Sequence, residues 1–255
     1  MNRQCQSLAC AIGMLFVSSA SMAETIKCTG STTITGVVFT QDVLKEIKDK
    51  LGIEVEAVGS SSGAGFKDLM EGKVPCSMST ASFASLLTKN NLGEGAGFKA
   101  WPLGSDTVVP VVHRNNAVKT KVLTKEQWAG IYSGKTKNWS EVGGPDLPVV
   151  VIISADEGSA TRQEVQKDIM GGAPYPADAR KATTTKDEVA AVGATLGGVG
   201  AVGKGLAAGN PAVAIMGEPL LKRDMILITK EPPAGFEKLV NHLRTPEVKA
   251  KTGIE

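Results

Sequence analysis

Apolar residues recur along this chain in two alternating spacings. Residues 53–58 (Ile-Glu-Val-Glu-Ala-Val) alternate apolar and polar side chains, which is typical of a strand with one buried face. Short apolar runs at 108–112, 149–153, 212–216 and 225–228 predict further strands. Spacings of three and four residues predict amphipathic helices with the apolar faces Val37, Val43, Leu44, Ile47 and Leu51, and Phe236, Leu239, Val240 and Leu243. This alternation predicts an α/β fold with mostly parallel sheets.

Three short stretches rich in serine, threonine and glycine each follow a strand-like run and precede a helical one. They are residues 30–33 (GSTT), 59–63 (GSSSG) and 157–161 (EGSAT). The first turn of a helix has unpaired N–H groups and the positive end of the helix dipole. Three such turns meeting at one point would form an anion site. The alternative for each stretch is a plain helix N-cap, which uses the same residue types.

The first 23 residues read as a secretory signal peptide. Arg3 precedes an apolar run at 8–17, and Ser21-Met22-Ala23 fits a small-x-small cleavage site. A membrane anchor is the alternative, but the apolar run is too short to span comfortably. We expect cleavage after Ala23 and export to the periplasm.

The remaining residues suffice for two lobes and carry little net charge. The formal charge of +2 falls to about +1 when Arg3 is removed. The chain has no basic cluster and few aromatic residues, so nucleic acid is not an expected partner. No long linker interrupts the chain, which indicates that strands cross between the lobes, with 108–112 and 225–228 as candidates. The expected lobes are residues 24–109 with 229–255, and residues 110–228.

The sequence gives little support for catalysis or for binding of a metal or cofactor. His113 and His242 lie far apart in the sequence, and no cysteine and histidine residues cluster as metal ligands would. No histidine base is apparent near a serine. We therefore expect a binding protein with no catalytic residue, metal or cofactor. Cys28 and Cys76 remain after export, either as a disulfide or as two small buried residues.

Several motifs resemble those of one protein family, and the likeness extends across the chain after residue 23. These segments are residues 59–67 (GSSSGAGFK), 123–128 (LTKEQW), 131–135 (IYSGK), 138–144 (NWSEVGG) and 158–162 (GSATR). They resemble the phosphate-binding proteins of bacterial ABC transporters. The resemblance implies a type II periplasmic-binding-protein fold, with two α/β lobes and a ligand cleft between them. It also implies a monomer that delivers phosphate or a similar oxyanion to a membrane permease.

The same resemblance implies the residues that contact the ligand. They fall in the three hydroxyl-rich stretches, with Thr80 at a position after the small-residue strand 76–79. The implied set is Ser31, Thr32, Thr33, Ser60, Ser61, Thr80, Ser159, Ala160, Thr161 and Arg162. The resemblance also places Cys28 and Cys76 on adjacent strands, where a disulfide is a possibility.

Two charged family positions differ in this chain. The family usually has an Asp where Thr80 stands, and an Arg where Ala155 stands. An Asp accepts the proton of monohydrogen phosphate and repels sulfate, so Thr80 predicts weaker discrimination between the two anions. The missing Arg removes a charge-assisted contact. Arg162 compensates if its side chain reaches the cleft, and points to solvent otherwise. The alternative function is a binding or sensor protein of the same fold with another oxyanion or small ligand.

Overall fold

The computed structural model describes residues 24–94, 96–120 and 122–255. The predicted signal peptide, residues 1–23, lies outside the described residues. Within the described part of the chain, no helix combines the length and the apolar character needed to cross a membrane.

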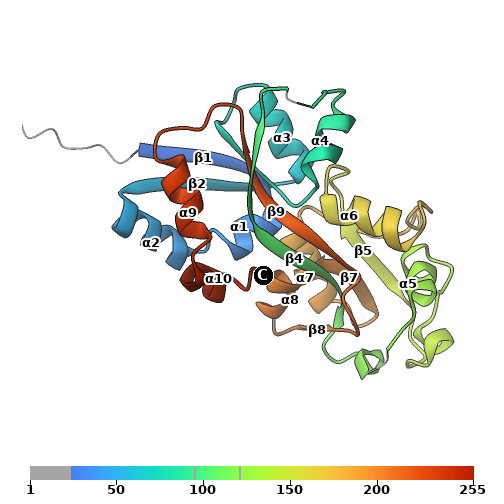
Figure 1. Cartoon of the computed structure of the whole chain (residues 1–255). Coiled ribbons are helices and arrows are strands. Elements are labelled where there is room, and N and C mark those ends of the chain that lie inside the picture. Colours follow the sequence, from blue (N-terminus) through green and yellow to red (C-terminus); the bar gives the residue numbers. More distant parts are fainter. Residues whose placement is uncertain (1–23, 95, 121) are drawn as a thin grey trace, which may run out of the picture.

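The first lobe is built on three strands that carry the first two hydroxyl-rich stretches. β1 (Glu24–Ser31) pairs in parallel with β2 (Ile53–Ser60) and β3 (Cys76–Ser79). The helices around them are α1 (Thr32–Val37), α2 (Gln41–Leu51), α3 (Ser62–Met70) and α4 (Phe83–Lys89). Two helices from the C-terminal end, α9 (Phe236–Leu243) and α10 (Pro246–Thr252), pack on the same lobe (Figure 1). The two predicted amphipathic faces meet in one core, where Val43 and Ile47 lie with Leu239 and Leu243.

The second lobe repeats the arrangement with different elements. β5 (Val150–Ser154) pairs in parallel with β6 (Arg180–Ala182) and β7 (Gly198–Gly203). β8 (Val213–Ile215) lies antiparallel to the long strand β4 (Lys99–His113). The helices are α5 (Lys125–Tyr132), α6 (Ala160–Glu164), α7 (Thr185–Gly193) and α8 (Lys204–Ala208). A π-helical turn at Val165–Ile169 extends α6, and short 3₁₀ turns occur at Ala117–Thr120 and Trp139–Val142.

Two long strands join the lobes. β4 and β9 (Leu221–Thr229) pair with each other in antiparallel fashion and run from one lobe into the other (Figure 1). Their ends near Trp101 and Leu227 belong to the core of the first lobe, whereas Val108 packs in the core of the second. Both runs expected to cross, 108–112 and 225–228, lie within these strands.

The expectation of mostly parallel pairing needs correction. Among the described residues, four strand pairs are parallel and four are antiparallel. The strand order is β2-β1-β3-β9-β4-β7-β5-β6, with β8 beside β4. Every antiparallel pair involves β4 or β9. The two strands that pass between the lobes, β4 and β9, run antiparallel to every strand with which they pair. Half of the strand pairs are therefore antiparallel.

Candidate functional site: a cavity lined by hydroxyl groups

The three hydroxyl-rich stretches meet around one small cavity. Each stands at the carboxyl end of a parallel strand, β1, β2 or β5, and leads into α1, α3 or α6. β1 and β2 pair in parallel, so their carboxyl ends lie at the same edge. β5 belongs to the second lobe, and the stretch that follows it meets the other two at the cavity from that side. The cavity is small, with a volume of about 10 Å³. Eleven of its twelve lining residues are serine or threonine: Ser31, Thr32, Thr33, Ser60, Ser61, Ser62, Thr80, Ser154, Ser159, Thr161 and Thr185, with Ala160 as the twelfth.

Nine of the ten candidate ligand residues line this cavity, and ten of the twelve lining residues are buried. Thr80 is 2% exposed. Its backbone N–H donates to Ser62 Oγ at 3.1 Å, and its hydroxyl lies 3.5 Å from Ser31 Oγ. The position where the family has an Asp therefore faces the cavity with a neutral hydroxyl.

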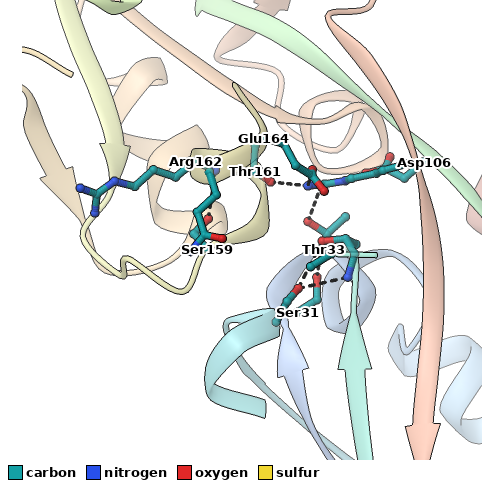
Figure 2. A network of polar contacts seen from close by, with 12 residues as sticks. Ser31, Thr33, Asp106, Ser159, Thr161, Arg162 and Glu164 are labelled. Atoms are coloured by element: carbon teal, nitrogen blue, oxygen red, sulfur yellow. Dashed lines mark hydrogen bonds and ion pairs between the residues drawn. The ribbon is translucent and has the colours of Figure 1, made fainter. Parts of the chain in front are cut away.

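Arg162 is the candidate that the cavity does not include. Its guanidinium donates to the carbonyl oxygens of Ser154 at 3.4 Å and Ala155 at 3.3 Å, and it lies 3.7 Å from the Glu157 carboxylate. Figure 2 shows the side chain pointing away from Ser31 and Thr33. The first turn of α6 directs this side chain back along the end of β5, so Arg162 does not replace the missing family Arg in this structure. Ala155 itself is exposed.

Helix capping and cavity lining turn out to be compatible. Ser61 Oγ accepts a hydrogen bond from Ala64 N–H at 3.1 Å, and Ser159 Oγ accepts one from Arg162 N–H at 3.4 Å. A serine hydroxyl has one proton and two lone pairs. Using a lone pair for the cap leaves the proton to be donated. The capping alternative and the anion-site interpretation are therefore compatible at Ser61 and Ser159, whereas Ser31, before α1, makes no side-chain cap hydrogen bond.

Two close backbone contacts bring the loops together, and each requires glycine. Gly30 has φ +137°, and a Cβ there would lie 2.1 Å from Met78 O. A Cβ on Gly65 of α3 would lie 2.4 Å from Gly30 Cα. Helix α3 can thus approach β1 closely enough to share a cavity with α1. Between the lobes, Gly63 N–H donates to Gly158 O at 3.3 Å.

Sequence reasoning missed three lining residues. Ser62 follows the proposed cap, Ser154 ends β5, and Thr185 begins α7. A signal for Thr185 was present, because Thr184 and Asp187 form a capping box at the start of α7. Thr185 thus adds a fourth helix start at the cavity.

A buried arginine from β9 lies directly behind the cavity wall, and no motif pointed to it. Arg223 Nη1 donates to Thr161 Oγ1 at 2.7 Å and lies 3.2 Å from Glu164 Oε2. Arg223 Nη2 donates to Thr33 Oγ1 at 3.4 Å and lies 3.1 Å from Asp106 Oδ2. Figure 2 shows Thr33, Thr161, Asp106 and Glu164 converging on this point.

The charges near the cavity lie outside its lining. None of the lining residues is ionisable. Burial raises the pKa of the Asp106 carboxyl and the pKa of the Glu164 carboxyl, and the neighbouring Arg223 lowers each of them by less. Glu188 of α7 is 4% exposed, accepts a hydrogen bond from Ala201 N–H at 3.1 Å, and has its pKa raised by burial to about 8. An anion in the cavity would thus meet hydroxyl and backbone N–H donors rather than a charged side chain.

Residues 59–63 also fit the Gly-x-Ser-x-Gly spacing of hydrolase nucleophile elbows. The structure uses the central residue, Ser61, as the cap of α3. The two histidines of the described chain are engaged elsewhere: His113 Nδ1 accepts from Asn115 N–H, and His242 Nε2 lies 3.3 Å from Glu46. Neither is placed as a base for Ser61.

Cys28 and Cys76 are register partners on β1 and β3, and both are buried free thiols here. Burial, with the Cys28 thiol alongside, raises the pKa of the Cys76 thiol. The disulfide stays a prediction for the exported protein.

The described chain thus combines a two-lobed α/β fold with a polar cavity between the lobes. Residues 17–232 match the family described as PBP superfamily domain, and the chain belongs to this family. The phosphate-binding protein PstS of Staphylococcus saprophyticus is 28% identical over 147 residues, which are 57% of this chain and 45% of the relative. The chain thus spans less than half the length of the curated relatives it matches.

Solved structures agree on the fold. A structure from Clostridium perfringens, described as a candidate phosphate ABC transporter substrate-binding protein with bound phosphate, matches with a TM-score of 0.78 at 23% identity. The matched region covers 91% of this chain and 98% of the chain from Clostridium perfringens. An ABC-type phosphate transport receptor from Vibrio cholerae matches with a TM-score of 0.64 at 22% identity, covering 90% and 98%. These likenesses confirm the expected fold class.

Proposed function

We propose that this protein captures a small tetrahedral oxyanion, phosphate first, and delivers it to the membrane permease of an ABC importer. The observation that carries the proposal is the cavity lined by eleven hydroxyl residues, nine of which stand at or next to the starts of four helices. Such a cavity offers many donors within the space of one small anion. The relatives named phosphate-binding proteins support phosphate as the first ligand to test.

Capture would work by closure of the lobes. The proposed lobes are residues 24–109 with 229–255, and residues 110–228, joined by β4 and β9. Ser31 and Ser61 come from the first lobe and Ser159 and Thr161 from the second, so an anion would contact both lobes at once. A ligand that contacts both lobes favours the closed state by its differential affinity. We propose that the chain acts as a monomer in the periplasm after cleavage behind Ala23.

Calorimetry on protein that has been unfolded, stripped of ligand and refolded tests this function. Phosphate, sulfate, arsenate and molybdate are titrated separately, with chloride as the control anion. We expect phosphate to bind with one site per chain and chloride not to bind. Failure of all four oxyanions to bind folded protein would overturn the proposal. Absence of turnover of a generic phosphate ester in the same preparation would support binding over catalysis.

A further inference from the structure

Six hydroxyl groups of the cavity already accept a hydrogen bond from an N–H group of the protein. Backbone N–H groups donate to Ser61, Ser62, Ser154 and Ser159. The guanidinium of Arg223 donates to Thr33 and Thr161. A hydroxyl that accepts in this way keeps its proton for another partner. The wall of the cavity is therefore biased toward donation.

Arg223 differs from the other donors because it reaches hydroxyls on both sides of the cleft. Thr33 lies in the first turn of α1 in one lobe, Thr161 lies in α6 of the other, and Arg223 lies on β9, one of the strands that join them. An arginine has only donors and a planar fork, so its two Nη atoms can hold two hydroxyls as acceptors at the same time. Asp106 and Glu164 fix the fork from behind, one at each Nη atom.

This arrangement is costly if it serves stability alone. Arg223 is 7% exposed, and its Nε–H is buried with no hydrogen-bond partner in the described chain. A buried unpaired donor destabilises the fold, and a buried ion pair is often no better than an apolar replacement. The cost points to a role at the cavity.

Building on the proposed oxyanion function, we propose that Arg223 is a positioning residue that makes Thr33 and Thr161 donate to the bound oxyanion. It acts through these two hydroxyls, from one layer behind the anion. In this way a cation compensates for the Arg that the family has at the position of Ala155, without entering the cavity itself.

A double-mutant cycle tests this role with phosphate as the probe. Arg223→Lys keeps a charge beside Asp106 and Glu164 but loses the fork. Thr161→Val keeps the shape of the side chain and removes the hydroxyl. We expect Arg223→Lys to weaken phosphate binding at least tenfold in the otherwise unmodified protein. In the Thr161→Val background the same change should cost at least threefold less, because one of its two targets is already gone.

Matched controls separate this role from general effects. Thr229→Val removes a buried hydroxyl that accepts from Trp101 Nε1 at 2.9 Å outside the cavity, and Arg244→Lys changes an arginine bonded to Pro102 O. Both should bind phosphate like the unmodified protein. If Arg223→Lys does not fold, the triple variant Arg223→Met, Asp106→Asn, Glu164→Gln takes its place in the cycle, since it leaves no buried charge unpaired.

The outcomes distinguish failure of the positioning role of Arg223 from failure of the proposed oxyanion function. Equal losses in both backgrounds, or no loss from Arg223→Lys, would overturn the positioning role and leave the oxyanion function standing. If the unmodified protein binds none of phosphate, sulfate, arsenate and molybdate, the proposed function fails and the role of Arg223 fails with it.

Discussion

The Ser159 hydroxyl shows how one side chain can serve both the fold and the cavity. It caps α6 by accepting from Arg162 N–H, and it lines the cavity with its proton still available. Replacing it therefore affects two quantities that can be measured separately, the stability of the protein and its affinity for an anion.

We expect Ser159→Ala to weaken phosphate binding about ten- to a hundredfold, because a hydrogen bond to a charged group contributes about 1.5–3 kcal/mol. Loss of the cap should also lower stability by about 1 kcal/mol. Calorimetry and thermal unfolding measure the two effects. Ser82→Ala is the matched control, since Ser82 caps α4 in the same way but does not line the cavity. It should lose stability and keep its affinity; unchanged affinity in Ser159→Ala would remove this loop from the site.

Selectivity should depend on Thr80. With a neutral hydroxyl at this buried position, we expect phosphate and sulfate to compete more evenly than in relatives with an Asp there. Thr80→Asp should reject sulfate by at least a hundredfold, because a buried carboxylate would face an anion without a proton to share. Thr80→Asn, of similar size and uncharged, should still bind sulfate. Strong exclusion of sulfate by the unmodified protein would show that another group accepts the phosphate proton.

Glu188 should make the stability of the protein depend on pH. Burial raises its pKa from a usual value near 4.5 to about 8, so the folded protein binds this proton more tightly than the unfolded chain does. Stability from this group is complete below about pH 4.5 and is lost as pH rises toward about 8. Glu188→Gln should remove this dependence and be more stable than the unmodified protein at pH 9, by on the order of 2 kcal/mol. Denaturant unfolding at pH 5 and pH 9 measures the free energy of unfolding of both proteins. An equal change in this free energy with pH for both proteins would contradict the assignment.

At the scale of elements, the loops depend on how closely α3 approaches β1. Gly65 lies against the backbone of Thr29 and Gly30, with no room for a side chain. This contact sets the distance between the Ser31 and Ser61 hydroxyls, so the geometry of the cavity depends on the packing of a helix against a strand.

Gly65→Ala should therefore push α3 away from β1, with a loss of about 1–3 kcal/mol in stability from overpacking. Phosphate affinity should fall at the same time, although Gly65 does not line the cavity. Gly93→Ala is the control, because a Cβ there has open space and no unusual φ is required. Unfolding midpoints and calorimetry are compared for the two variants. A Gly65→Ala protein with full stability and full affinity would show that the helix can shift freely.

The sequence was most informative where local chemistry decides the structure. The spacing of Val43 and Ile47 predicted a helix, and hydroxyl residues after strands located the cavity loops. It failed for β7, whose sequence GVGAVG has no alternating pattern. The glycines of this strand leave space for large side chains to pack against it. Tyr132 Oη donates to Gly200 O, and a Cβ on Gly200 would lie 2.9 Å from the Glu188 side chain. Arg223 was missed for a similar reason, since Lys222-Arg223-Asp224 resembles an ordinary charged surface run until the lobes surround it.

At the scale of the whole molecule, the described lobes meet over the cavity. Gly63 from one lobe and Gly158 from the other lie in direct contact, and a Cβ on Gly158 would lie 2.7 Å from Ser61 Oγ. The fold class followed from the alternation of strands and helices. The mixed sheet did not, because the direction of pairing is decided by the two strands that pass between the lobes.

Enclosure of the cavity sets a limit on residence time. If an anion binds as proposed, side chains from both lobes surround it, and its exit would require Gly63 and Gly158 to separate. Its escape can then be no faster than the opening of the lobes, a motion that takes microseconds to milliseconds in other two-lobed proteins. Anions of different affinity would share this upper bound. A partner that holds the lobes apart would thus control when the cargo is released, without contacting the anion at all.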